Sequence, residues 1–271
     1  MESMPVVPSA VPTLPRRFRN IEILTIAYRT TPDGIARFLP EQLSARGERA
    51  IVHIYRLHDP DWFGSYGELA VHIPVRHDAS GVEGSYSPMF VLESDAAIAA
   101  GRELFGQPKK AGTVTLAPDG DLLVGRVMRN GIDLLTATMA YKQQPSSVAA
   151  LNELSFGTNI NPKVIPATDG SGDAIRELTA RDFTEVDVHE VWEGNATVEV
   201  RPHAQVPVHL LPVLEVERAF HWRADFTAVY GRVLERLPVG DEAQRVPPTS
   251  RRLDTETVRS TPTPPPSPPG L

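Results

Sequence analysis

The sequence predicts a mainly antiparallel β fold of the α+β class, a barrel or a sandwich with a few short helices. Runs of β-branched and aromatic residues recur along the chain and are separated by Gly, Pro, Asn and Asp. The dipeptide Asn130-Gly131 lies between two apolar runs and is among the strongest short signals of a β-hairpin. Many antiparallel strands with few helices are typical of barrels and sandwiches.

The predicted elements are runs of β-formers bounded by turn residues. We expect strands at residues 22–28, 50–57, 69–75, 113–116, 122–128, 132–141, 185–192 and 196–201. A short helix is predicted over 32–40, which is bounded by two prolines. For residues 219–237, strand and helix are both open.

The middle of the chain contains one clear predicted helix, residues 96–104. Ser94 or Asp95 is a plausible N-cap, because a short polar side chain accepts a hydrogen bond from the first helical turn. Gly106 and Pro108 end the helix. The two lysines that follow therefore begin the next element.

Composition limits the classes of function. A chain of 271 residues with 41% hydrophobic and 23% charged residues is long enough for one sizeable domain. A net charge of −7 and a pI near 5.6 argue against a nucleic-acid partner. The sequence shows neither a membrane-spanning apolar run nor a secretory signal at its start, so we expect a soluble, cytoplasmic protein without a membrane partner.

The prolines indicate the domain boundaries. We expect residues 1–15 to form an extended arm and residues 16–240 to form the folded domain. Residues 241–271 are rich in Pro and poor in large apolar residues, so we predict a disordered tail. A polyproline ligand for an SH3-like partner is the functional alternative.

Several kinds of site are missing from the sequence. It contains no dinucleotide-binding glycine motif, no phosphate-binding Walker loop and no serine-hydrolase elbow. There is no cysteine, which excludes thiolate metal sites and cysteine catalysis. The eight histidines show no His-x-x-x-His spacing on a helix, so we expect scattered structural or surface histidines and no metal site.

The adjacent lysines Lys109 and Lys110 are the most informative residues for function. Most lysine pairs are solvated surface residues. In an apolar neighbourhood, however, burial or a second cation lowers the pKa of a lysine amine from its usual value of about 10.4. A free amine attacks ketones and forms Schiff bases.

Their context resembles the signature of the acetoacetate decarboxylase family. A helix of small residues is followed by Gly-Arg-Glu-Leu at 101–104 and by Pro-Lys-Lys at 108–110. Further blocks are similar to family segments and fall in family order over roughly residues 17–237: 20–30, 66–75, 136–142, 159–166, 188–194 and 224–233.

The resemblance implies a cone-like β-barrel, a homo-oligomer, and Schiff-base decarboxylation of a small β-keto acid without a cofactor. By motif position the nucleophile would be Lys109, with Lys110 as its neighbour and Glu68 near the imine. Successive side chains of an extended segment point to opposite faces. We therefore expect burial to activate Lys109 and Lys110 to have a secondary or structural part.

One position departs from the family pattern. Family decarboxylases carry an arginine directly after the asparagine that corresponds to Asn20, and here that residue is Ile21. An arginine is well suited to bind a substrate carboxylate. Arg19 has the same strand parity as residue 21, so it could point into the same space. The alternative is that Ile21 indicates a larger or more apolar substrate, or a different reaction.

Two other functions remain open. Relatives that act as aldolase-dehydratases on keto acids, for instance in secondary metabolism, resemble each other in a glutamine four residues before the lysine. Here that residue is Phe105, which favours the decarboxylase and could line an apolar substrate pocket. The third hypothesis is a non-catalytic barrel that binds a hydrophobic carboxylate.

Overall fold

The computed structural model describes residues 3–4, 7–154 and 157–239. The predicted Pro-rich tail at 241–271 lies outside the described residues.

One large sheet dominates the described part of the chain. Ten of its twelve strands pair in the order β10 (Gln144–Pro145), β13 (Phe183–Glu193), β15 (Glu215–Ala228), β1 (Arg16–Arg29), β3 (Arg49–Pro60), β4 (Tyr66–His77), β5 (Glu83–Leu92), β11 (Thr158–Pro166), β12 (Asp173–Arg181) and β16 (Arg232–Arg236). The other two are β2 (Leu43–Ala45), which pairs with β4, and β6 (Lys109–Ala111), which pairs with β5. All pairings are antiparallel except those of β5 with β11 and with β6.

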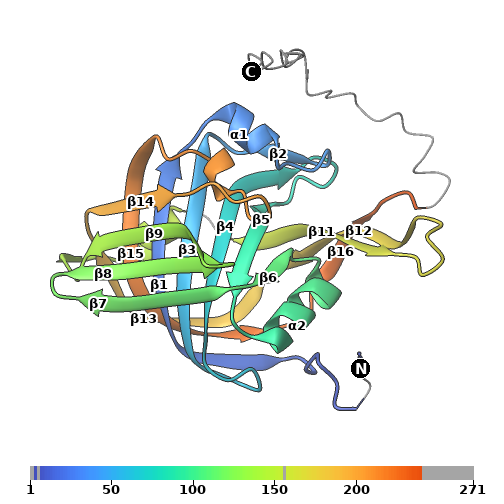
Figure 1. The fold of residues 1–271 in the computed structure, drawn as a ribbon, viewed down its shortest axis with the longest axis horizontal. Helices are drawn as coiled ribbons and strands as arrows, with labels where there is room; N and C mark the ends of the chain where they lie inside the picture. The colour runs from blue at the N-terminus through green and yellow to red at the C-terminus, as the bar shows by residue number, and fades with distance from the viewer. Residues whose placement is uncertain (1–2, 5–6, 155–156, 240–271) are drawn as a thin grey trace, which may run out of the picture.

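A second, antiparallel sheet of four strands has the order β14 (Ala196–Val200), β9 (Ile132–Ala140), β8 (Leu122–Arg129) and β7 (Thr113–Asp119). Strands β7, β8 and β9 cross in front of β1 and β3 (Figure 1). Asn130 and Gly131 join β8 to β9 with φ angles of 54° and 74°, so the predicted hairpin is confirmed.

The described helices are short: α1 (Pro32–Ala36), α2 (Asp95–Phe105), α3 (Val148–Asn152) and the 3₁₀ helix η1 (Val208–Leu210). The Ser94 hydroxyl accepts a hydrogen bond from the Ala97 N–H and caps α2, as predicted. Gly106 ends α2 in the left-handed conformation, with φ of 68°. This helix end directs the chain into β6.

The predicted fold class, mainly antiparallel β with a few short helices, is confirmed, and so are the predicted strands. The helix alternative for residues 219–237 is wrong, because β15 and β16 occupy this segment. The predicted helix at 32–40 ends earlier, at Ala36. Sequence analysis did not identify β5 and β12, in which polar residues, and in β5 also a proline, interrupt the apolar runs. It found β11 only as the family-like block 159–166.

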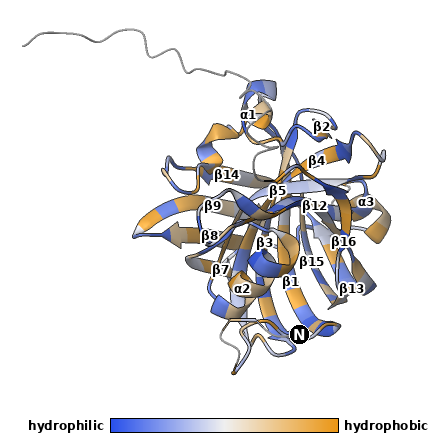
Figure 2. Ribbon diagram, turned by 90° about the vertical axis from the view of Figure 1, so that its right-hand side faces the viewer, coloured by the Kyte–Doolittle hydropathy of each residue, from blue (hydrophilic) through white to orange (hydrophobic). Residues whose placement is uncertain are grey.

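Both faces of the long strand β1 are buried. Leu24, Ile26 and Tyr28 belong to a core cluster that also contains residues of the four-stranded sheet. Ile21 and Ile23 point the other way, into a second cluster that includes residues of α2. Figure 2 shows hydrophobic segments along the strands of the sheet. Two cores on opposite faces of one sheet hold its central strands in place.

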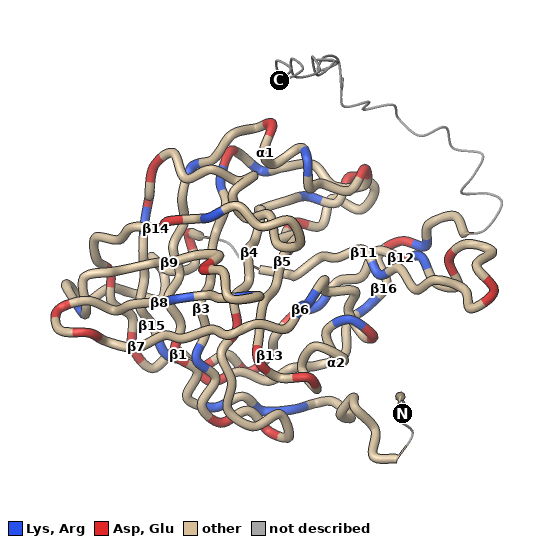
Figure 3. The backbone as a smooth tube through the Cα atoms, viewed as in Figure 1, with Lys and Arg blue, Asp and Glu red and all other residues tan. Residues whose placement is uncertain are grey.

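The surface carries both signs of charge. Figure 3 shows Lys and Arg mixed with Asp and Glu over the same strands. Within the described residues, no helix is long and apolar enough to cross a membrane.

The packing of the four-stranded sheet can be tested with two adjacent leucines. Leu123 is fully buried in the first cluster, whereas Leu122 is 38% exposed. We expect Leu123→Ala to lower the free energy of unfolding by about 2–5 kcal/mol through lost burial and a residual cavity. Leu122→Ala, the matched control, should change it by about 0.5 kcal/mol or less. Urea unfolding of both variants measures this, and equal losses would contradict the packing described.

Candidate active site

Lys109 is the first residue of β6 and lies beside Phe90 of β5 in the parallel pairing. Its side chain passes close to α2 at Gly101, where a methyl group would lie 2.5 Å from the Lys109 Cδ. The glycine therefore leaves the space that the lysine stem occupies. Lys109 is only 7% exposed, which is unusual for a lysine.

Glu68 of β4 is the partner of the buried amine. The Lys109 Nζ lies 3.1 Å from Glu68 Oε1 and donates a hydrogen bond to Oε2 at 3.3 Å. Glu68 itself is 8% exposed. The Phe90 ring also lies near the amine, with its centroid 5.4 Å from Nζ.

These side chains line a cavity, which we call the Lys109 cavity. The cavity has a volume of about 120 Å³. On the same measure one water molecule needs about 10–15 Å³, so the cavity has room for a small organic acid. Its wall is mostly apolar and includes Pro12 and Leu14 of the N-terminal arm. The polar and charged residues in the wall are Tyr55, Tyr66, Glu68, His72, Gln107, Lys109, Asn159 and Arg181.

Burial sets the protonation of Lys109. Desolvation lowers the pKa of its amine from the usual value, because a buried ammonium loses its hydration. The Glu68 carboxylate opposes this shift and the charge of Arg181 adds to it. The net result is a lowered pKa and a larger fraction of free amine at a given pH.

Lys110 lies on the other side of β6. Its ammonium donates hydrogen bonds to the backbone oxygen and to the side-chain oxygen of Gln205, and it does not line the Lys109 cavity. The nearby cation that lowers the Lys109 pKa is Arg181 rather than Lys110. The structure thus separates the two lysines that are adjacent in sequence.

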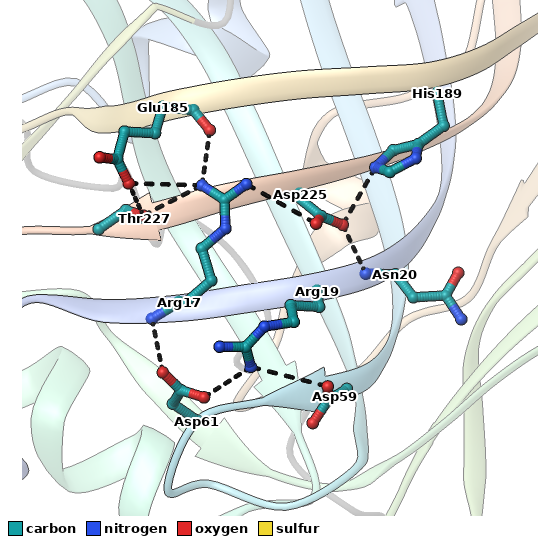
Figure 4. Close-up of polar contacts among 9 residues, drawn as sticks. All are labelled: Arg17, Arg19, Asn20, Asp59, Asp61, Glu185, His189, Asp225 and Thr227. Carbon is teal, nitrogen blue, oxygen red and sulfur yellow. Dashed lines mark hydrogen bonds and ion pairs between the residues drawn. The ribbon is translucent and has the colours of Figure 1, made fainter.

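Arg19 also lies away from the cavity. Its side chain is 45% exposed, and its guanidinium lies 2.7 Å from Asp61 Oδ1 and 3.7 Å from Asp59 Oδ2 (Figure 4). Ile21 is fully buried in the second core cluster. The prediction that Arg19 points into the same space as residue 21 is wrong, since the pairing register shifts here and Asn20 has φ of 50°.

Phe105 lies in the cavity wall at the end of α2 and is 5% exposed. Arg181, the last residue of β12, packs against two aromatic rings. Its guanidinium carbon lies 4.5 Å from the Phe105 ring centroid and 4.4 Å from that of Phe183. The Arg181 Nε is buried and has no hydrogen-bond partner among the described residues.

A cluster of hydrogen-bonded polar side chains forms a further part of the cavity wall. The His72 Nδ1 lies 2.9 Å from the Ser87 hydroxyl, and the Asn159 amide donates to the same hydroxyl at 2.7 Å. The Gln107 amide donates to Asn159 Oδ1 at 3.0 Å. Burial lowers the His72 pKa to about 4, so this imidazole is neutral at neutral pH.

The structure therefore brings Lys109, Glu68 and Phe105 together, while Lys110, Arg19 and Ile21 lie outside the cavity. Sequence analysis missed Arg181 and His72. His72 lies within the family-like block 66–75 but gave no signal of its own, and Arg181 ends a strand that was not predicted. The described residues contain no group of three His, Cys, Asp or Glu side chains that could hold a metal ion.

Comparisons with known proteins agree with this geometry. The family model described as acetoacetate decarboxylase matches residues 3–237. An enzyme of Mesorhizobium japonicum named acetoacetate decarboxylase 2 is 38% identical over 232 residues, which cover 86% of this chain and 88% of that enzyme.

Solved structures show the same fold. A structure described as acetoacetate decarboxylase superposes with a TM-score of 0.82 at 34% identity, covering 87% of this chain and 96% of the other. The acetoacetate decarboxylase of Legionella pneumophila gives a TM-score of 0.79 at 32% identity, covering 83% and 89%. The family model and these relatives each cover most of the chain, and the chain therefore belongs to the acetoacetate decarboxylase family.

Proposed function

We propose that this protein decarboxylates acetoacetate or a related short β-keto acid through an imine on Lys109. The observation that carries the proposal is the buried amine of Lys109, which lies against Glu68 in a mostly apolar cavity. Relatives that are 35–38% identical over most of the chain are named acetoacetate decarboxylases. A small keto acid is therefore the substrate class, and a homo-oligomer and a cytoplasmic location remain predictions.

The reaction begins at the free amine. Its lone pair attacks the ketone carbon, and loss of one water with uptake of one proton gives a protonated imine. The imine nitrogen is then bonded to the carbon next to the one that bears the carboxylate. This arrangement makes the cation an acceptor for the electron pair of the breaking carbon–carbon bond.

The later steps return the lysine. The bond to the carboxylate breaks, carbon dioxide leaves, and its electron pair forms an enamine that neutralises the imine charge. Protonation of the enamine carbon regenerates an imine, and water hydrolyses it to the ketone and the free amine. The mostly apolar wall strengthens the electrostatic interactions of these steps, because it lowers the local dielectric constant.

Glu68 is suited to the proton transfers. Its oxygens lie 3.1 Å and 3.3 Å from the amine, within reach of the protons that leave and return during imine formation and hydrolysis. A carboxylate in this position also stabilises the cationic imine. The same interaction raises the Lys109 pKa, so Glu68 limits the activation that burial supplies.

Borohydride trapping with acetoacetate tests the imine. We expect a reduced adduct on Lys109, located by peptide mass, together with release of carbon dioxide. Lys109→Met should lose the adduct and roughly 10⁴-fold or more of kcat/KM, because the nucleophile is gone. Lys110→Met, the matched control, should keep the adduct. An adduct without carbon dioxide would indicate an aldolase or dehydratase, and no adduct would indicate a non-catalytic barrel.

Glu68→Gln tests the electrostatics of the pair. Removal of the carboxylate should lower the Lys109 pKa further, because Glu68 raises it in the native protein. The rate of imine formation falls at acidic pH as the amine becomes protonated, and in this variant that fall should move to lower pH. The measurement is the rate of borohydride trapping with acetone, a neutral ketone, across a pH series. Glu199→Gln, at an exposed position, is the control. A limb that stays in place or moves to higher pH would contradict the assignment.

Gly101→Ala tests the space behind the lysine. The added methyl group would lie 2.5 Å from Lys109 Cδ and 2.6 Å from Cε, so the amine must move. We expect kcat to fall about a hundredfold. Alanine favours a helix over glycine by about 1 kcal/mol, so the urea unfolding midpoint should not report a general loss of fold. Full turnover in this variant would show that the lysine position is not critical.

A further inference from the structure

We propose that Arg181 binds the substrate carboxylate, since neither Arg19 nor Ile21 lines the Lys109 cavity. The inference rests on the function proposed above and adds the residue that recognises the acid group. It also implies that a keto acid binds more tightly than a neutral ketone of the same size.

Position is the first argument. Arg181 ends β12, and its Cα pairs with Asn159 of β11, another residue of the cavity wall. Lys109 and Arg181 line the same cavity from different elements. The other candidate, Arg19, is held by two aspartates away from this cavity. Among the described cavity residues, Arg181 is the arginine available to a ligand.

The second argument is that the guanidinium is fixed, although none of its hydrogen bonds or salt bridges goes to a described residue. The rings of Phe105 and Phe183 lie within 4.5 Å of its central carbon and restrict its orientation. Within the described residues the guanidinium makes no hydrogen bond or salt bridge, its buried Nε has no hydrogen-bond partner there, and the Glu68 carboxylate acts on it through its charge. A planar cation in this state is preorganised for a carboxylate, which accepts two parallel hydrogen bonds.

The third argument is charge. With Lys109 as a free amine, the cations and anions of the cavity are Arg181 and Glu68, which balance. A bound keto acid adds one negative charge, and formation of the protonated imine adds one positive charge. The cavity is then neutral again at the stage that precedes loss of carbon dioxide. A neutral cluster is the arrangement that a poorly hydrated site accommodates best.

This role affects substrate binding more than turnover. Arg181 would hold the carboxylate in the ground state, and that charge disappears as carbon dioxide forms. An interaction present in the ground state and not strengthened in the transition state lowers KM without raising kcat. Arg181 is thus a binding residue, and its removal should separate the two constants.

The test compares Arg181→Gln with Arg19→Gln. At a pH above the titration of Lys109, we expect Arg181→Gln to raise KM for acetoacetate by about ten- to a hundredfold while kcat changes only a few-fold. Arg181→Lys keeps the charge but loses the planar guanidinium, so its KM should lie between those of the native protein and Arg181→Gln. Arg19→Gln should leave KM unchanged. A KM that rises in Arg19→Gln and not in Arg181→Gln would overturn the proposal.

Two further measurements distinguish its failure from failure of the decarboxylase function. Trapping with acetone at the same high pH should persist in Arg181→Gln, because a neutral ketone does not need the arginine. Equal losses with acetone and acetoacetate would show a merely structural role and overturn the inference.

Butyrate, a carboxylate without a ketone, should bind the native protein and bind Arg181→Gln at least about tenfold more weakly by calorimetry. This readout holds even if the native protein releases no carbon dioxide, and equal butyrate binding would refute the carboxylate site.

Discussion

The contact between Lys109 and Glu68 is the interaction on which the chemistry of this protein depends. Burial alone would leave the amine neutral but poorly positioned, and the carboxylate alone would hold it as an inert ammonium. The pair combines the two effects: the apolar wall lowers the pKa of the amine, while Glu68 fixes its position at 3.1 Å. The charge of Arg181 lowers the pKa of the amine further.

The fold supplies the pair from neighbouring strands. Glu68 lies on β4, Phe90 on β5 and Lys109 on β6, and these three strands are consecutive in the sheet. Helix α2 lines the same cavity and is capped at both ends by residues that the local sequence specifies, Ser94 and Gly106. Two cores on opposite faces of the sheet hold these strands in place, so the backbone positions from which the two side chains extend are fixed.

The sequence predicted the parts of this arrangement that local signals encode. Lys109 followed from a motif, and the opposite directions of Lys109 and Lys110 followed from strand alternation. The same alternation failed for Arg19, because a register shift with a positive φ at Asn20 breaks the parity. Arg181 was missed for another reason: its strand has a mixed polar sequence, and its proximity to Lys109 arises only when β12 pairs with β11. Long-range pairing of this kind has no local signature.

The burial of Lys109 also has a thermodynamic cost. Because its pKa is lower in the folded protein than in the unfolded chain, the unfolded state binds a proton more readily between the two pKa values. The free energy of unfolding therefore rises with pH through that window and is lowest where both states carry the ammonium. The protein thus gives up part of its stability near neutral pH to keep a reactive amine. A ligand that binds the cavity only in the folded state raises the free energy of unfolding through mass action. The protein without ligand is therefore less stable than the protein with ligand bound.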